Sequence, residues 1–563
     1  MQFNKTLLRL LFIFFPCLAM AQTTYLTRGD KQEIMLERLE IKAQRDSVLN
    51  LSKTKPYSRE TYMEAVRKYV NGDSLTNLTE VDNYYLRSLM ANNPDWLTPD
   101  ERAQYLSRKP ILKHFYTSPA ALYEAHIKDF DLVVNPLLNI GYVNEKDNDS
   151  KLFYNARGVS VRGKIADRIG FAASLTDNQE RSPAYVQQWM AERSAVPNAG
   201  YYLDYKDKGG VDYFDGRGYI TFGATKYVDI AFGYDRNFIG NGQRSLFLSD
   251  FSNNTLFLKL NTRIWKLNYQ NIFMELKHGY QHGMGDKLIG KKYAAVHHLD
   301  VNVTPWLNVG LFEGVVFGRL NKFEFTYLVP VIFLRSMERD AGSPDNAMVG
   351  FDFKANVAKT AQFYGQLLMD EFKLKELTAG KGWWANKFGY QLGAKYIDAF
   401  TVKNLDLQAE WNYVRPFTYS HYDSVANYSH YNQPLAHPLM ANFNEFIGVV
   451  RYRPIPKLSF EGKLVTYLQG KDSTANVNFG SNLFLPNSWG RNSDYDFKVG
   501  SGWKTNVSLI NLLFSYELRE NLFIDLNAQF RRQKYTTPPV SNTNSTVVGM
   551  GVRWNMGRRD FLF

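Results

Sequence analysis

"LFIDLNAQFR", residues 522–531, alternates between two sets of side chains. The first set is apolar and comprises Leu522, Ile524, Leu526, Ala528 and Phe530. The second is mainly polar and comprises Phe523, Asp525, Asn527, Gln529 and Arg531. Because successive side chains of a strand point to opposite faces, this pattern predicts a β-strand with one apolar face.

The same alternation recurs elsewhere, in "LSFEGKLVTYLQ" (458–469) and "LDLQAEWNY" (405–413). In a soluble sandwich the apolar face of such strands would lie in the core. In an outer-membrane barrel it would meet lipid, and the polar face would line the lumen. Periodicity alone does not separate these two architectures.

The connections between the alternating runs favour a barrel. Short turns are expected at 166–168, 225–227, 261–263, 304–306, 358–360, 401–404, 453–457 and 519–521. Much longer polar stretches separate the hairpins, for example 177–216, 415–443 and 470–504. Short turns at one end and long loops at the other are typical of bacterial barrels. With a first strand near 132–142 and a closing strand near 546–556, the pattern predicts a mainly β fold, a transmembrane antiparallel barrel of about eighteen strands.

Two segments do not fit this pattern. "FEFTYLVPVIFLRSM" (323–337) is apolar but interrupted by Pro330, so it reads as an extra strand pair, giving about twenty strands, or as a loop folded into the lumen. In "LNVGLFEGVVFG" (307–318), Glu313 falls on the apolar face, which a β-bulge would correct.

The first residues resemble a secretory signal peptide. Lys5 and Arg9 precede an apolar run, and Ala19-Met20-Ala21 forms a small-x-small cleavage site, so we assign residues 1–21 to the signal. The apolar run is shorter than the roughly 20 residues that a spanning helix needs. The single cysteine, Cys17, lies within it, so the mature chain is expected to contain neither disulfides nor a catalytic thiol.

Residues 22–130 are predicted to form a periplasmic helical domain, and residues 131–563 the barrel. "TPDERAQYL" (98–106) has Thr98 as N-cap, Pro99 at the first helical position and Glu101 placed to complete a capping box. Thr79 and Asp82 form a second, weaker box. Two further amphipathic stretches, 31–49 and 58–70, complete a domain of a few short helices.

Composition agrees with a barrel in the outer membrane of a Gram-negative bacterium. Aromatic residues make up 15% of the chain, with 36 Tyr and 39 Phe, while the mean hydropathy is −0.36. Barrels carry such aromatic residues in girdles at both rims. The formal net charge of +12 favours anionic partners such as acidic polysaccharide or lipid headgroups, and secretion argues against nucleic acid.

Several stretches resemble the Wzi-type capsule-assembly family of outer-membrane proteins, which includes relatives associated with gliding motility. They are "NPLLNIGY" (135–142), "NARGVSVRGKI" (155–165), "RNFIGNGQRSLFLSDF" (236–251) and "NKFEFTYLVPVIFLRSMERDAGSPDNAMVGFDFK" (321–354). The resemblance implies an eighteen-stranded barrel with a periplasmic helical bundle. It also implies a lectin-like role in holding capsular polysaccharide at the cell surface.

The turn Gly240-Asn241-Gly242 lies between Arg236 and Arg244. A dinucleotide fingerprint would need a third glycine, but Ser245 stands there and a strand-like run follows. We therefore expect an external loop without a nucleotide.

Polar recognition is the remaining possibility for a site. The candidate ligand-binding residues are Arg236, Asn241, Arg244, Arg335, Arg339, Tyr422 and Tyr428. Guanidinium groups match the carboxylates of uronic acids, and tyrosine rings offer stacking faces for sugars. No cofactor is expected. His297 and His298 are adjacent in a strand and cannot share a metal ion, and no nucleophile motif suggests catalysis.

The sequence therefore predicts a non-enzymatic barrel that binds capsular or surface polysaccharide through many weak contacts and helps to retain or assemble it. Its other expected partners are outer-membrane lipid, the barrel assembly machinery and periplasmic proteins that meet the helical domain. Two alternatives stay open. One is a porin-like channel for small solutes, and the other is a subunit of a gliding-motility or secretion complex. Whether the lumen is open or plugged separates the channel from the binding protein.

Overall fold

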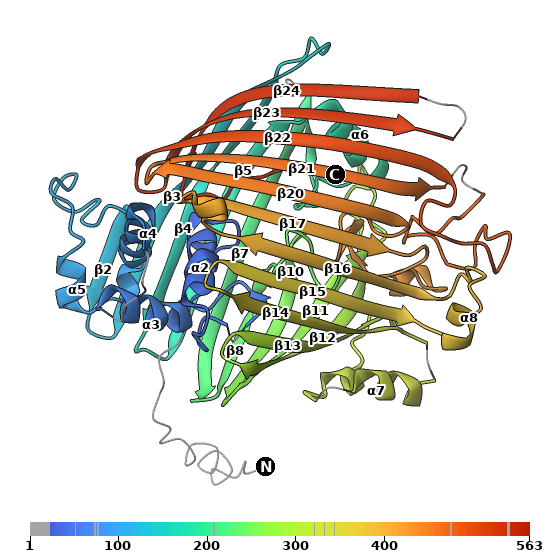
Figure 1. The fold of residues 1–563 in the computed structure, drawn as a ribbon, viewed down its shortest axis with the longest axis horizontal. Helices are drawn as coiled ribbons and strands as arrows, with labels where there is room; N and C mark the ends of the chain where they lie inside the picture. Colours follow the sequence, from blue (N-terminus) through green and yellow to red (C-terminus); the bar gives the residue numbers. More distant parts are fainter. Residues whose placement is uncertain are drawn as a thin grey trace, which may run out of the picture.

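Eighteen antiparallel strands close into a barrel (Figure 1). The structure is a computed structural model that describes residues 23–50, 52–72, 75, 78–206, 209–319, 321–331, 333–342, 344–472, 474, 476–537 and 541–563. The expected signal peptide lies outside these residues. Each strand pairs with its neighbours in the chain, and β24 closes the barrel against β3, with Gly551 opposite Gly141.

The barrel strands are β3 (Phe130–Glu145), β4 (Leu152–Ile165), β5 (Ile169–Arg181), β7 (Gly210–Thr225), β8 (Val228–Asp235), β10 (Thr255–Ile264), β11 (Leu267–His278), β12 (Gly290–Thr304), β13 (Leu307–Phe317), β14 (Asn346–Val357), β15 (Ala361–Glu371), β16 (Lys387–Tyr396), β17 (Leu405–Val414), β20 (Phe443–Ile455), β21 (Leu458–Lys471), β22 (Trp503–Arg519), β23 (Leu522–Tyr535) and β24 (Ser541–Trp554). Two shorter strands, β2 (Tyr123–Ile127) and β6 (Leu203–Tyr205), pair with β3 and β7. The prediction of an eighteen-stranded barrel is confirmed.

The wall of the barrel is apolar outside and polar inside. On β23, Leu526 is 46% exposed, whereas the neighbouring Asp525 is 8% exposed and faces the lumen. Trp265 and Phe400 project at the rim formed by the short turns. An apolar outer face with aromatic rims is the arrangement that a bilayer selects.

The short turns lie where the alternation predicts them, with one exception. The turn expected at 261–263 lies at Trp265 and Lys266, because β10 continues to Ile264. Residues 323–337 are not an extra strand pair; they form the 3-10 helix η3 (Phe325–Leu328) and the helix α7 (Leu334–Asp340). β13 has no bulge at Glu313, whose side chain therefore remains on the outer face.

Among the described residues before the barrel there are four α-helices: α2 (Lys31–Ala43), α3 (Arg59–Val70), α4 (Glu80–Ala91) and α5 (Pro99–Ala103), with the 3-10 helix η1 (Pro94–Trp96) between the last two. Both predicted capping boxes are present, at Thr98 with Glu101 and at Thr79 with Asp82. Met63, Val66 and Leu89 lie in the core of this bundle. The strand β2 falls inside the segment that was expected to be helical.

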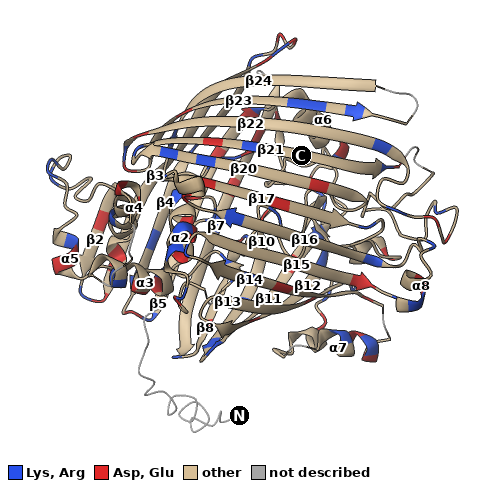
Figure 2. Cartoon of the chain, in the orientation of Figure 1, with Lys and Arg blue, Asp and Glu red and all other residues tan. Residues whose placement is uncertain are grey.

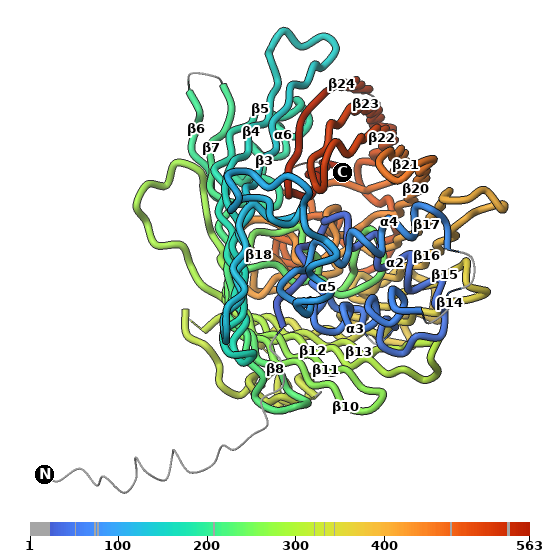
Figure 3. Tube along the Cα trace, turned by 90° about the vertical axis from the view of Figure 1, so that its left-hand side faces the viewer, coloured from blue at the N-terminus to red at the C-terminus, as the bar shows by residue number. Residues whose placement is uncertain are grey.

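The helices lie over the short-turn end of the barrel (Figure 1), and a view from that end shows them across its mouth (Figure 3). Among the described residues, no helix has the length and apolar character needed to cross a membrane. Three further helices lie at the long-loop end: α6 (Ala184–Arg193), α8 (Leu374–Thr378) and the one-turn η5 (Ser424–Ala426). The one-turn η4 (Ala399–Thr401) lies in the short turn between β16 and β17, at the opposite rim.

Candidate functional site

The lumen is closed by two segments that enter from opposite ends. Strand β1 (Thr54–Lys55) rises from the helical bundle, and strand β9 (Phe238–Ile239) belongs to the loop between β8 and β10. They pair inside the barrel, with Thr54 opposite Ile239, and Gly240 N donates to Lys53 O at 2.9 Å. Backbone hydrogen bonds thus join the helical end of the barrel to the long-loop end through its interior.

Ion pairs anchor the helical segment to the wall. Lys53 Nζ lies 2.5 Å from Asp352 and 3.3 Å from Asp300, and all three side chains are buried. Arg38 of α2 bridges Asp82 of α4 and Asp406 of β17. Removing one partner of such a buried pair typically costs about 3–5 kcal/mol, because the remaining charge is left buried without compensation.

The loop between β8 and β10 folds inward, so the expectation of an external loop at Gly240-Asn241-Gly242 is wrong. Glu410 of β17 accepts hydrogen bonds from Gln243 N at 2.7 Å and Arg244 N at 3.1 Å. A Cβ at position 242 would lie 2.4 Å from Glu410 Oε2, so only glycine allows this approach. The backbone donors that a phosphate would use are therefore occupied by a carboxylate of the same protein.

A second loop, between β17 and β20, closes the lumen from the same end. Tyr428 is buried, and its hydroxyl donates to Phe247 O at 2.7 Å. Ser249 Oγ donates to Ala436 O, which ties the two loops together. The interior of the barrel therefore contains an apolar core of its own, made largely from these two loops.

The chain terminus also turns back into the lumen. After β24, residues 555–563 leave the wall, and Phe563 packs against Trp189 and Phe251. Arg244 donates to Leu562 O, and Tyr185 OH donates to Phe561 O at 2.6 Å. The terminal aromatic residue is thus a lumenal anchor and not the last residue of the closing strand, which ends at Trp554.

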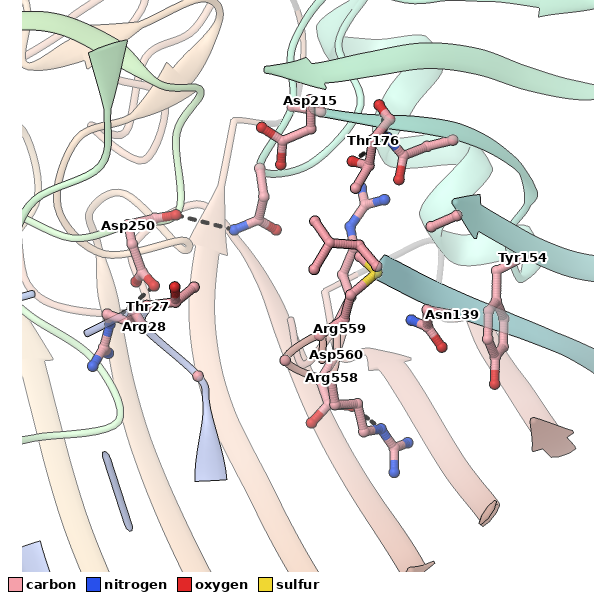
Figure 4. A pocket seen from close by; sticks show the side chains of 18 of the residues that line it. Thr27, Arg28, Asn139, Tyr154, Thr176, Asp215, Asp250, Arg558, Arg559 and Asp560 are labelled. Carbon is pink, nitrogen blue, oxygen red and sulfur yellow. Dashed lines mark hydrogen bonds and ion pairs between the residues drawn. The ribbon is translucent and has the colours of Figure 1, made fainter. Parts of the chain in front are cut away.

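Between these inserted segments and the wall lies a cavity of about 570 Å³. Strands β3, β4, β5 and β7 form one side, and the N-terminal segment, the inward loop and the C-terminal tail form the other (Figure 4). The lining extends from Asp30 and Arg59 near the helices to Ser182 at the start of α6. It therefore follows the wall over much of the height of the barrel.

Arginine dominates the charge of this cavity. Arg28 contacts Asp250 at 2.9 Å, and Asp215 lies 2.6 Å from Arg217 and 3.4 Å from Arg236. The cavity also holds the following other cationic side chains: Arg59, Arg162, Arg181, Arg244, Lys463, Arg558 and Arg559. The acidic lining residues are fewer: Asp30, Glu180, Asp215, Asp235, Asp250, Asp525 and Asp560. The excess of positive charge suits an anionic ligand.

Several guanidinium donors at this cavity are buried without a hydrogen-bond partner among the described residues. They are Arg236 Nε, Arg244 Nε and Arg558 Nη1. Tyr154 lies in the same cavity, where Gly141 and Gly551 leave room for its ring. Arginine side chains and aromatic rings in one cavity suit a carboxylated sugar, because guanidinium groups pair with the carboxylate and rings stack on the sugar.

The structure brings only Arg236 and Arg244, of the predicted site residues, to the cavity. Asn241 is buried in the inward loop, and Tyr428 in the second loop. Tyr422 is exposed at the long-loop end, and Arg335 and Arg339 lie on α7, which is outside the barrel. These seven residues therefore do not form one site.

Arg558, Arg559 and Arg28 line the cavity but are absent from the predicted site. Arg558 and Arg559 follow the closing strand, which was expected near 546–556, in the stretch "GRRDFLF" (557–563). Two arginines and an aspartate after the closing alternation mark a segment that leaves the wall. Arg559 contacts Glu180 at 3.0 Å and Pro197 O at 2.6 Å, so it fixes the tail against β5 and the loop after α6.

His298, Asp300 and Asp352 form a cluster with the donor types of a metal site. The ammonium group of Lys53 lies between the two carboxylates, and His298 Nε2 donates to Asp352 at 3.0 Å. The positive charge of Lys53 thus balances the negative charges of Asp300 and Asp352. His297 faces the opposite side of the wall, as the sequence predicts.

Acidification is expected to loosen the loop between β17 and β20 through His430. Burial lowers the pKa of this residue from 6.5 to about 3, and neighbouring Lys292 and Lys277 act in the same direction. In the folded loop its ring is neutral, accepting from Lys277 N and donating to Asn254 O. Its contribution to closure is therefore complete above about pH 6.5 and is lost as the pH falls toward 3.

Hydrogen–deuterium exchange of residues 415–442, corrected for intrinsic rates, should rise between about pH 7.5 and about pH 5. The variant His430→Asn, whose amide oxygen can still accept from Lys277 N, should show a flatter dependence. His282→Asn, on a different loop, is the matched control and should behave like the unmodified protein. An equally steep dependence in His430→Asn would show that another group causes the loosening.

No family model matches the chain, and no curated protein sequence matches it. Among solved structures, the chain is similar to Wzi of Escherichia coli, described as an outer-membrane protein involved in group 1 capsule assembly and a carbohydrate-binding β-barrel. The TM-score is 0.57 at 13% identity, covering 95% of this chain and 100% of that one. OprD of Pseudomonas aeruginosa (TM-score 0.42, 14% identity, 78% and 97% covered) and OccAB4 of Acinetobacter baumannii (0.41, 12%, 75% and 97%) also match. The first likeness shows that the chain has an outer-membrane barrel fold.

Proposed function

We propose that this protein is a plugged outer-membrane barrel that binds acidic surface or capsular polysaccharide and helps to retain or assemble it, without catalysis. The observation that carries the proposal is the lumenal cavity with its excess of cationic side chains, among them Arg236, Arg244 and Arg558. Its volume is within the range of about 300–1,000 Å³ of small-molecule sites, so a chain end or a short segment of the polymer would enter it.

In this proposal the helical bundle faces the periplasm and the long loops face outward. Short turns are periplasmic in bacterial barrels, and the bundle lies at that end. The carbohydrate-binding activity of the Wzi barrel supports the proposed class of ligand. Tyr154 would supply a face on which a sugar ring stacks.

A porin-like channel for small anionic solutes is the second candidate. It is favoured by one observation, the length of the cavity, whose lining extends from the helical end to the start of α6. Small shifts of the inserted segments would turn such a cavity into a passage. Electrical conductance separates the two functions.

Arg558→Gln should weaken the binding of oligomers of a uronic-acid polysaccharide by about ten-fold or more, because a charged hydrogen bond contributes roughly 1.5–3 kcal/mol. Titration calorimetry on the purified barrel would measure this affinity, with dextran oligomers as the neutral comparison. Arg558 is preferred to Arg244, since Arg244 also holds Leu562 O and Glu445.

Arg87→Gln, an exposed arginine of α4 outside the cavity, is the matched control and should bind like the unmodified protein. Equal affinity of Arg558→Gln and Arg87→Gln would remove the cavity from the binding site. Equal affinity of the unmodified protein for acidic and neutral oligomers would contradict the proposed ligand class.

A further inference from the structure

A row of polar side chains lies on the outer face of the barrel. Asn271, His297 and Glu313 are adjacent in register across β11, β12 and β13. They share a face with Leu311, which is 48% exposed on the lipid-facing wall, yet all three are buried. A charged group on this face would be unfavourable in a membrane, so something must cover it.

The loop between β13 and β14 covers this row. Glu313 accepts from Phe333 N at 2.7 Å, from Leu334 N at 3.0 Å and from His297 Nδ1 at 2.9 Å. Tyr327 and Leu334 of the loop pack in one apolar cluster with outer-wall residues such as Val315 and Phe317. The loop therefore lies against the outside of the barrel, where α7 is visible below the wall (Figure 1).

The hydrogen bonds to Glu313 set the depth of the loop. Glu313 follows the first residue of β13, Leu307, by six positions, and six residues of a strand tilted by about 40° rise about 15 Å. The apolar band of an outer-membrane barrel is about 25 Å tall. Phe333 and Leu334 therefore lie within the height of the band, below its long-loop edge.

The loop also exposes large apolar side chains. Phe325 is 76% exposed, Phe333 is 64% exposed, and Val331 between them is also exposed. Arg335 and Arg339 follow one helical turn apart on α7, and both are exposed. Basic and acidic residues are visible on this helix in Figure 2.

We propose that the loop between β13 and β14 is inserted in the outer leaflet of the membrane and binds a phosphorylated lipid there. Phe325, Val331 and Phe333 contact the acyl chains, and Arg335 and Arg339 contact the phosphate groups of the headgroup. Lipid is the occupant because the apolar side of the loop continues the lipid-facing wall, where Leu311 and Phe351 are exposed beside it. This inference rests on the proposal that the barrel spans the outer membrane.

Cysteine labelling tests the depth directly, because the described residues contain no cysteine. The variants Phe325→Cys and Phe333→Cys would each be labelled with an environment-sensitive fluorophore. They would then be placed in phosphatidylcholine bilayers whose acyl chains bear a nitroxide as the quencher. Leu526→Cys on the wall is the control for membrane insertion. Asp149→Cys, exposed in the loop between β3 and β4, is the control for an aqueous position.

Quenching of labels at 325, 333 and 526, without quenching at 149, is the expected result. Quenching at 526 but at neither loop position would overturn the inference and leave the membrane-spanning barrel intact. No quenching at 526 would overturn both. Heat modifiability of each variant, read on gels, shows that the barrel has folded before the fluorescence is measured.

Native mass spectrometry with added lipid A tests the headgroup contact. The double variant Arg335→Gln with Arg339→Gln should retain at least about five-fold less lipid A than the unmodified protein. The double variant Arg87→Gln with Arg108→Gln removes the same amount of positive charge at the opposite end of the barrel. It should retain as much lipid A as the unmodified protein. Equal retention in the two double variants would overturn the assignment of Arg335 and Arg339 to the phosphate groups.

Discussion

Planar bilayers that contain the full-length protein should carry no steady current, whereas a variant lacking residues 28–121 and 238–248 should carry a measurable one. The deletion removes both strands of the β1–β9 pair and the helices across the short-turn mouth. It retains β2, which pairs with β3. Barrels of sixteen to eighteen strands have room for an aqueous channel. Removing these inserts should therefore open part of the lumen, although the loop between β17 and β20 and the C-terminal tail remain inside it.

The closed lumen is the physical reason for this expectation. Lys53 is fixed to Asp352 on the wall, and Gly240 N is bonded to Lys53 O, so neither insert moves freely. Once the inserts are gone, water can hydrate Asp300 and Asp352, and the barrel should still fold. Deletion of 28–121 alone is the internal comparison and should conduct less, since the long-loop core remains.

A large steady current from the full-length protein would contradict the plugged lumen and favour the porin-like function. The measurement also separates that function from binding, because a barrel that stays silent while it binds uronic-acid oligomers cannot be acting as a general porin.

Leu526→Arg should strongly impair assembly of the barrel in the membrane. Leu526 lies on the outer face of β23, four residues from the start of the strand, and so near the middle of the apolar band. An arginine on the lipid face near the midplane costs about 2–4 kcal/mol. The yield of heat-modifiable barrel in the membrane fraction measures the effect.

Asn527→Arg is the matched control, because the next residue of the same strand faces the polar cavity. It should assemble nearly as well as the unmodified protein. Equal loss of barrel in the two variants would mean that the strand tolerates no charge on either face, and the assignment of faces would be wrong.

Local patterns in the sequence were sufficient to predict the barrel and the residues at which helices start. The alternation in 522–531 predicted which face of β23 is apolar, and the structure has β23 from Leu522 to Tyr535. Thr98 with Glu101 predicted the start of α5. The turn between β10 and β11 was displaced by a few residues, because alternation defines the face of a strand more sharply than its end.

The site was predicted poorly, and the reason is visible in Gly240-Asn241-Gly242. Its sequence describes a turn with nearby arginines, which suits an exposed loop as well as a buried one. What buries it is Glu410, 167 residues further along the chain, whose carboxylate binds the backbone of Gln243. No local pattern encodes a contact of that range.

The sequence by itself therefore determined the barrel, its strand faces and its helical N-terminal segment. These depend on side-chain periodicity and capping, which are local properties of the chain. The tertiary structure alone decided that two loops and the C-terminal tail enter the lumen, that the loop bearing Phe333 covers the outer wall, and that a cavity lined by Arg558 remains between them. Those features depend on hydrogen bonds and ion pairs between residues far apart in the chain, which form only once the closed wall brings them together.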